Sequence, residues 1–341
     1  MKAKKQLLVM ATAALGASAA MAQSSVTMYG IVDLEVGKYD GSTAIRENTG
    51  ATSRWGLKGS EDLGGGYRAV FWLEQQFNPN DGTLYNSSSF FSGRSTVGLE
   101  GWFGHLVMGR DVNASHYVEV SADPFGQDGL VAGYGARGGI SQANGGPGQI
   151  DTVRTNNSAD YAYTWANLTF RAMVAARDSA IQAGEGNIPY SASLIYEDKS
   201  LKLGVSWLRP QSDNAHWAYT SGQYDVGLAR LYAGYGFGQN TFQQIMHNQM
   251  AGISIPTGVY GVVRATFSHT TAYGHTIQSR SVLGYAYFLS KRTSVYADAT
   301  YDANCGKYAY RTGSTTGANG WQPTGTTASG TGFTVGLKQV F

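Results

Sequence analysis

The chain has 341 residues, of which 25 are Lys or Arg and 23 are Asp or Glu, so its formal net charge is +2. This balance excludes the strongly basic surface of a nucleic-acid-binding protein, and a single cysteine excludes an intramolecular disulfide framework. With 46 glycines, seven prolines and 12% aromatic residues, the composition is typical of many strands joined by turns.

The first 22 residues have the pattern of a secretory signal peptide. Lysines near the start precede an apolar run from Leu7 to Ala20, and Ala20-Met21-Ala22 has the A-x-A form of a cleavage site. The run is too short and too rich in Ala and Gly for a membrane helix, and no later apolar run approaches the roughly 20 residues that such a helix needs. We therefore expect residues 1–22 to be removed and residues 23–341 to form one domain.

Segments of alternating polarity follow in the first half of the chain. In the segment 24–39, Val26 and Met28 share one face, whereas Thr27 and Tyr29 share the other. Two further alternating pairs, within residues 53–77 and 93–110, are joined by short Gly-rich turns. Alternation of period two predicts β-strands with one apolar face, and the short turns predict hairpins.

The second half repeats this pattern in pairs within residues 190–207, 251–267 and 282–301. Leu283, Tyr285, Tyr287 and Leu289 have one parity and are predicted to face outward together. The segment 332–341 also alternates and ends on Phe341. We expect this strand to pair with the first one and to close a barrel that has no free edge.

The connections are of two kinds, short turns and long polar loops. We predict the long loops at residues 40–52, 209–222, 236–247, 269–278 and 302–331, with Cys305 in the last of them. Short turns at one rim and long loops at the other are typical of bacterial outer-membrane barrels, and 341 − 22 = 319 residues allow about 16 strands. The alternative of a soluble β-sandwich or propeller is weaker because no linker and no blade-length repeat is visible.

With these segments in view, the chain resembles the Gram-negative general diffusion porins, especially their β-proteobacterial branch. The resemblance runs through SSVTMYGIVDLEVG, SRWGLKGSEDLGGGYRAVFWLEQQF, GRSTVGLEGWFGHLVMGRD, YFLSKRTSVYADATY and VGLKQVF. It implies an all-β, 16-stranded transmembrane antiparallel barrel in the outer membrane, in contact with lipid, with a long third loop folded into the lumen. It also implies a homotrimer, passive passage of ions and small hydrophilic solutes, and no covalent chemistry or cofactor.

The resemblance also implies a constriction between the third loop and the wall. Residues 112–158 form the longest stretch without alternation, and its acidic residues are expected to face the water path: Glu119, Asp123 and Asp128. The basic residues expected on the opposite wall are Arg54, Lys58, Arg68, Arg94 and Arg264. Charge facing lipid costs roughly 2–4 kcal/mol at the midplane, which favours inward placement. The simpler interpretation is that these charges solvate the lumen or form wall salt bridges.

Two other function classes remain as alternatives. Long exposed loops are compatible with an adhesin or receptor. An outer-membrane enzyme is weakly supported, because no serine stands out and the six histidines lack the H-x3-H spacing of a metal site.

Overall fold

The computed structural model describes residues 24–38, 45–48, 50–129, 153–176, 188–210, 215–239, 245–272, 274–305, 308–311, 320–323 and 328–341. The predicted signal peptide, residues 1–22, lies outside the described residues.

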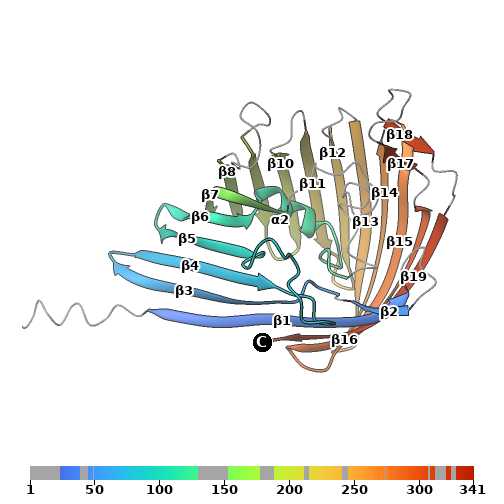
Figure 1. Ribbon diagram of the computed structural model, residues 1–341, viewed down its shortest axis with the longest axis horizontal. Coiled ribbons are helices and arrows are strands. Elements are labelled where there is room, and N and C mark those ends of the chain that lie inside the picture. Colours follow the sequence, from blue (N-terminus) through green and yellow to red (C-terminus); the bar gives the residue numbers. More distant parts are fainter. Residues whose placement is uncertain are drawn as a thin grey trace, which may run out of the picture.

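Within the described residues, sixteen strands form one closed antiparallel ring, as the sequence predicts (Figure 1). In ring order these are β1 (Ser25–Lys38), β3 (Arg54–Gly64), β4 (Tyr67–Gln76), β5 (Arg94–Gly101), β6 (Gly104–Val112), β7 (Arg154–Trp165), β8 (Leu168–Ala175), β9 (Tyr190–Glu197), β10 (Leu201–Arg209), β11 (His216–Asp225), β12 (Arg230–Gln239), β13 (Ile245–Thr257), β14 (Gly261–Ala272), β15 (His275–Phe288), β16 (Thr293–Cys305) and β19 (Ala328–Val340). The short β2 (Ile45–Asn48) pairs with the end of β1, and β17 (Tyr308–Arg311) pairs with β18 (Gly320–Pro323) in a separate hairpin.

The ring closes between its first and last strands. Residues 31–38 of β1 pair with residues 333–340 of β19, while residues 25–31 of β1 pair with β3 on the other side. Gly30 and Phe341 extend this ladder, because each donates its N–H to the carbonyl of the other at 3.0 Å. The ring of Phe341 lies against Gly30, where a Cβ atom would meet the Phe341 Cζ atom at 2.3 Å. Closure therefore uses the terminal aromatic residue and a residue without a side chain opposite it.

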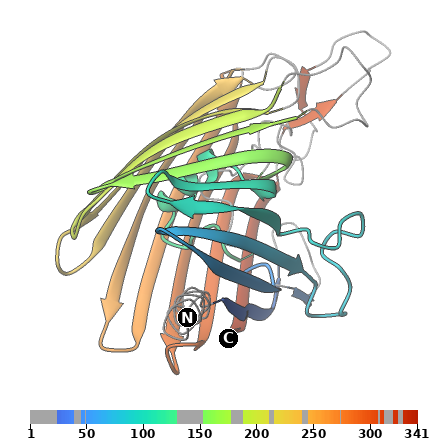
Figure 2. The same ribbon diagram turned by 90° about the vertical axis from the view of Figure 1, so that its left-hand side faces the viewer.

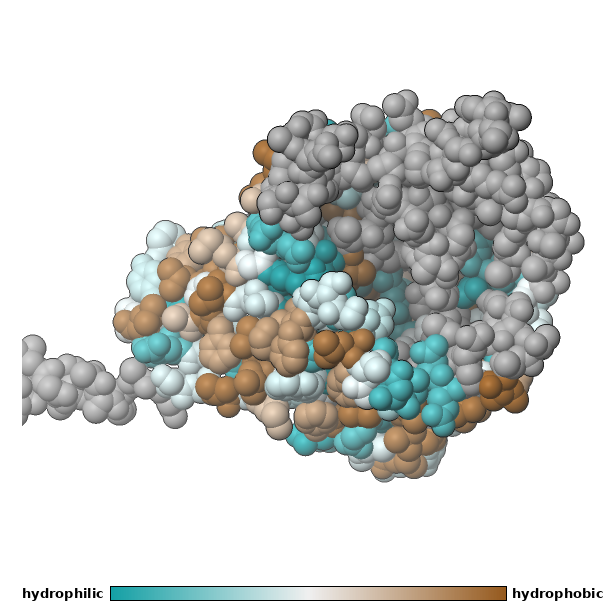
Figure 3. Space-filling model, in the orientation of Figure 1, coloured by the Kyte–Doolittle hydropathy of each residue, from teal (hydrophilic) through white to brown (hydrophobic). Residues whose placement is uncertain are grey.

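The outer surface of the ring carries apolar side chains. Leu283, Tyr285, Tyr287 and Leu289 are all exposed, as their shared parity predicts, while Ala286, between Tyr285 and Tyr287, is buried. Apolar residues are also visible over the region of β1 and β3–β6 (Figure 3). A barrel with an apolar outside and a polar inside suits a bilayer, because the backbone is satisfied internally and the outer side chains contact lipid.

Short turns gather at one rim, where adjacent strands such as β13–β14 and β15–β16 turn back (Figure 2). Three of the predicted long loops are wrong: β11 occupies much of residues 209–222, β12 and β13 cover all but 240–244 of residues 236–247, and β14 and β15 cover most of residues 269–278. Cys305 is the last residue of β16 and not part of a loop. In β11 the large apolar residues Trp217 and Tyr219 face inward, so the segment lacks the expected outward apolar face.

These inward aromatic residues pack against helix α2 (Ala114–Ser121), which lies inside the ring against β8–β11 (Figure 1). The helix begins after Asn113, whose side-chain oxygen accepts a hydrogen bond from the N–H of His116 at 3.0 Å, a typical N-cap. Val118 of the helix and Ala122 after it are fully buried among apolar residues of β9–β13. In the described part of the chain, no helix is long and apolar enough to cross a membrane.

Leu283→Arg should lower the free energy of unfolding by roughly 2–4 kcal/mol if the position lies near the midplane, because the side chain would carry charge into lipid. Leu289→Arg, at the end of the same row and beside the β15–β16 turn, should cost only about 0–1 kcal/mol. Denaturant unfolding of both variants in lipid vesicles measures the difference. Equal costs would show that this row does not run from the midplane to the rim.

Candidate pore constriction

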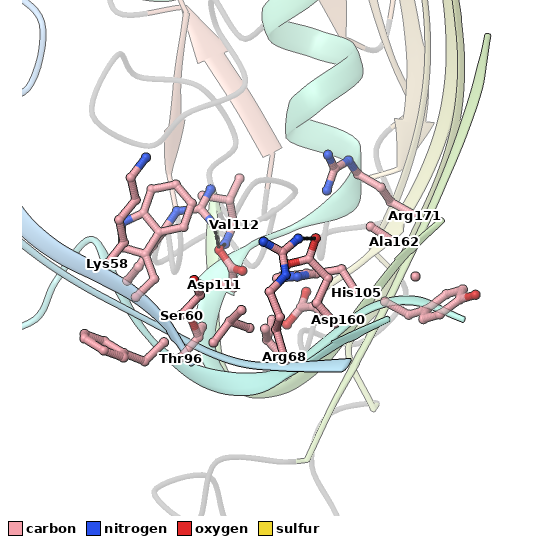
Figure 4. A pocket seen from close by; sticks show the side chains of 18 of the residues that line it. Lys58, Ser60, Arg68, Thr96, His105, Asp111, Val112, Asp160, Ala162 and Arg171 are labelled. Carbon is pink, nitrogen blue, oxygen red and sulfur yellow. Dashed lines mark hydrogen bonds and ion pairs between the residues drawn. The ribbon is translucent and has the colours of Figure 1, made fainter. Parts of the chain in front are cut away.

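A cavity of about 870 Å³ lies inside the ring, between α2 and the inner faces of β3–β8. Charged side chains from several strands converge on it: Lys58, Arg68, Arg94, Glu100, Asp111, Asp160 and Arg171. In Figure 4 Lys58 and Arg171 lie on opposite sides of the cavity, and Arg68 and Asp111 lie between them. Tyr117 and Ala114 of α2 complete the lining. Among the described residues, no group of His, Cys, Asp and Glu side chains could hold a metal ion.

Four of the five predicted basic residues form ion pairs with carboxylates of the wall, three of them around this part of the ring and the fourth, Arg264, elsewhere. Arg54 lies 3.9 Å from Glu74, and Arg68 lies 3.2 Å from Glu100. Arg94 pairs closely with Asp111 in the adjacent strand, β6. These basic side chains therefore point inward, but the partners that the structure gives them are strand residues and not the acidic residues of the third loop.

Glu74 organises one end of this network. One of its carboxylate oxygens accepts a hydrogen bond from the Tyr29 hydroxyl at 2.8 Å, and the other lies 3.6 Å from Arg154 and 3.9 Å from Arg54. Glu74 itself is almost completely buried. A buried carboxylate needs such partners, since an unpaired charge in a low-dielectric site is costly.

Two guanidinium groups stack on aromatic rings at the edge of the cavity. Arg94 lies 4.2 Å from the centre of the Trp72 ring and donates a hydrogen bond to the Tyr117 hydroxyl at 3.0 Å. Arg171 lies 4.0 Å from the centre of the Tyr117 ring. Stacking holds a cation in place without neutralising it. Within the described residues, no carboxylate lies within ion-pair distance of Arg171 or Lys58.

The three predicted acidic residues lie on the other side of α2 or beyond its end. Glu119 is 1% exposed and accepts a hydrogen bond from the Ser115 hydroxyl at 2.6 Å. Asp123 is buried and accepts hydrogen bonds from the backbone N–H groups of Phe125 and Gln127. Asp128 is partly exposed and pairs with Lys338 at 2.8 Å. Of the three, only Asp128 presents its side chain to an open space.

Asp128 and Lys338 line a second, smaller cavity of about 180 Å³ near the β15–β16 turn. Arg264, also predicted for the basic wall, is here: it stacks on Phe125 at 4.5 Å and lies 3.9 Å from Asp298. Arg264, like Arg94 through Tyr117, is therefore a predicted basic residue that contacts the loop segment itself. The arrangement separates a larger cavity on the β3–β8 side from a smaller one on the β14–β19 side.

A model of the Gram-negative porin family matches residues 8–307 of the chain. The chain belongs to the Gram-negative porin family. It is 33% identical to outer membrane porin protein 32 of Delftia acidovorans, with 99% of this chain and 100% of the relative covered. It is 31% identical to an outer membrane porin protein of Bordetella pertussis, with 88% and 94% covered.

Solved porin structures have the same fold. The anion-selective porin from Comamonas acidovorans superposes with a TM-score of 0.73 at 26% identity, covering 94% of this chain and all of that one. The trimer form of OmpT from Vibrio cholerae gives a TM-score of 0.69 at 15% identity over 93% of this chain and 99% of that one, which shows the fold alone. This porin is thus an outer-membrane barrel that forms a passive diffusion channel for small hydrophilic solutes.

Sequence reasoning missed several charged residues of this porin that line the lumen. Arg171 and Arg154 belong to β8 and β7, two strands that the alternation did not single out. The sequence does contain a signal for Arg171, because it alternates with the apolar residues Phe170 and Val174. Both of these are exposed on the outer face, which leaves Arg171 on the inner one. Lys338 likewise falls on the parity opposite to Leu337 in the last strand.

A pH dependence of stability is expected at Asp123 of the porin. Burial raises the pKa of this carboxyl from 3.8 to about 7, against the opposing effects of the N–H groups of Phe125 and Gln127 and of the Arg264 charge. The unfolded chain therefore releases this proton at a lower pH than the folded one. The protonated Asp123 carboxyl therefore contributes fully to the free energy of unfolding below about pH 3.8, and this contribution is lost as the pH rises through about 7.

Asp123→Asn should consequently gain stability relative to wild type as the pH rises through this range, by up to about 4 kcal/mol. Denaturant unfolding at about pH 4, 6 and 8 measures this gain. Gln127→Ala is the control, because it removes no ionisable group and its effect should be independent of pH. A constant difference between Asp123→Asn and wild type would contradict the buried, proton-holding state of the carboxyl.

Proposed function

We propose that this porin prefers anions and that its selectivity is set in the cavity between α2 and β3–β8. The observation that supports this most directly is the pair of cations, Lys58 and Arg171, that face the cavity without a carboxylate partner among the described residues. Arg94 lies between α2 and β4, stacked on Trp72. A permeating anion would pass these positive groups in turn.

The charges of the cavity lining favour the same sign. Four cations, Lys58, Arg68, Arg94 and Arg171, stand against three carboxylates, Glu100, Asp111 and Asp160, which gives 4 − 3 = +1. Since Arg68 is paired with Glu100 and Arg94 with Asp111, the remaining charges are Lys58 and Arg171 against Asp160, which again gives 2 − 1 = +1. Charges near a narrow water path act through a lower effective dielectric and weaker salt screening than exposed surface charges, so even a small excess influences permeation.

The similarity to an anion-selective porin, at 26% identity, supports the same sign of selectivity. The predicted constriction residues then have two roles. We propose that Lys58 and Arg94 line the water path, whereas Arg54, Arg68 and Arg264 hold the wall through ion pairs. Glu119 and Asp123 hold the loop in place, and Asp128 tethers it to β19.

Replacing both unpaired cations, with Lys58→Gln and Arg171→Gln together, should shift the reversal potential of single channels in a salt gradient toward cations. The expected change in the anion-to-cation permeability ratio is roughly twofold or more, since the net charge of the cavity lining changes from +1 to 1 − 2 = −1. Lys199→Gln, which removes a charge in the exposed β9–β10 turn, is the control. A shift no larger than that of the control would show that selectivity is set elsewhere.

We further propose that the protein is exported with cleavage after Ala22, assembles as a homotrimer and acts by diffusion without catalysis. The signal pattern supports export, and the exposed apolar residues of β1 and β3–β6 supply a surface for lipid or a neighbouring copy. Native mass spectrometry of the detergent-solubilised protein tests the cleavage after Ala22 and the trimeric assembly at once. The expected mass is three copies of residues 23–341; a monomer mass or an intact N-terminus would contradict the respective proposal.

A further inference from the structure

Four glycines on the inner wall lie directly beneath the segment that begins in α2 and ends at Phe125. They belong to four strands: Gly204 in β10, Gly234 in β12, Gly252 in β13 and Gly284 in β15. A Cβ atom at Gly204 would lie 2.9 Å from Val118, and one at Gly234 would lie 2.9 Å from Ala122; in both cases a wall side chain is still nearer, Ser221 at 2.8 Å for Gly204 and the Tyr219 hydroxyl for Gly234. These distances are shorter than ordinary van der Waals contacts, so the backbone of the wall itself forms the contact surface.

The other two glycines continue the same contact along the chain. A Cβ atom at Gly252 would lie 2.8 Å from the Pro124 ring, which is its nearest neighbour, and one at Gly284 would lie 2.6 Å from the Phe125 ring and nearer still to the Asp298 carboxylate of the wall. The order of the glycines around the barrel thus follows the order of the loop residues in sequence. The segment runs along the wall from β10 to β15 and contacts the four glycines one after another. We call these four glycine positions seats.

Strand register places Gly204 and Gly234 in one row, whereas Gly252 and Gly284 lie two and four residues along their strands from that row. Gly204 and Gly234 both lie opposite Ser221 of β11, whose hydroxyl is 2.7 Å from that of Ser121 in α2. Farther along, Gly284 lies opposite Arg264, which stacks on Phe125. Contacts between wall and loop therefore also come from residues directly opposite three of the glycines.

We propose that Gly204, Gly234, Gly252 and Gly284 are positioning residues that set how far the segment 118–125 stands out from the wall, and so set the bore of the channel. The inference rests on the proposed function, in which α2 and the loop border the water path. Glycine at each seat lets the segment lie against the strand backbone. A side chain at a seat would push the segment toward the cavity between α2 and β3–β8.

The loop, and not the wall, should move when a seat is filled. Each strand of the wall is held by hydrogen bonds to a strand on either side, as β13 is by β12 and β14. The segment is held by fewer polar contacts, such as Ser121 to Ser221 and Asp128 to Lys338. Packed interiors resist overfilling, so the added volume is accommodated where restraint is weakest.

Gly252 offers the sharpest test, because Pro124 alone supplies the atoms that would lie within 3.0 Å of its Cβ atom. Gly252→Val should lower single-channel conductance about twofold, because the displaced loop narrows the lumen. The double variant Gly252→Val with Pro124→Gly should recover most of the conductance, since the ring that meets the new side chain is removed. Circular dichroism and heat-modified gel mobility confirm that each variant forms the barrel.

Two control variants separate loop displacement from added bulk. Ser254→Leu adds a side chain on the same face of β13, at a residue whose hydroxyl lies 3.3 Å from that of Tyr232. Gly222→Val adds one on the outer face of β11, where the nearest atom to a Cβ would be 3.5 Å away on Leu203. Both should keep conductance close to that of wild type.

The proposal is overturned if Gly252→Val conducts like wild type, or if Ser254→Leu lowers conductance as strongly. It is also overturned if Pro124→Gly does not restore the Gly252→Val channel. The Lys58→Gln, Arg171→Gln channel is measured in the same bilayers. If its reversal potential shifts while Gly252→Val keeps wild-type conductance, the proposal about the glycines is rejected and the proposed anion selectivity stands. If neither the reversal potential nor the conductance changes, both proposals are rejected.

Discussion

A strand inside a bilayer has no water to satisfy its backbone, so every N–H and C=O group must find a partner in a neighbouring strand. The whole architecture depends on this requirement, and the pairing of β1 with β19 is where it is finally met. The reciprocal hydrogen bonds between Gly30 and Phe341 extend the ladder past the last residue of β19. Because the ring is closed, the inner wall is a rigid surface on which loop and side chains can be placed accurately.

The wall is not uniformly polar inside, and this explains where sequence patterns succeeded and failed. Alternation located strands whose apolar residues face outward, such as β15 with Leu283 and Tyr285. It failed at β11, where Trp217 and Tyr219 face inward to pack against α2. A rule that assumes one apolar face toward lipid cannot recognise a strand whose apolar partner is another part of the same chain.

The candidate site shows a similar division between what is local and what is not. Parity alone places Lys58 and Arg94 on the inner face, and both line the larger cavity. Parity does not tell which carboxylate an arginine meets, because that depends on the register of neighbouring strands. Ser95 of β5 pairs with Arg110 of β6, so the next residues along these two strands, Arg94 and Asp111, lie side by side and form an ion pair. The loop acids were expected to take this role, but the described segment 118–125 packs against the opposite wall.

The placement of the loop also decides which charges remain effective. By lying against β10–β15, the segment 118–125 brings Asp123 and Asp128 toward Arg264 and Lys338, away from the β3–β8 wall. Carboxylates on the strands therefore pair with the cations of that wall. Among the described residues they pair with Arg68 and Arg94 but not with Lys58 or Arg171. Stacking on Tyr117 orders Arg171 without neutralising it, so a positive charge is fixed beside the larger cavity. The apolar and small residues that seat the loop are thus as important for the electrostatics of the channel as the charged residues themselves.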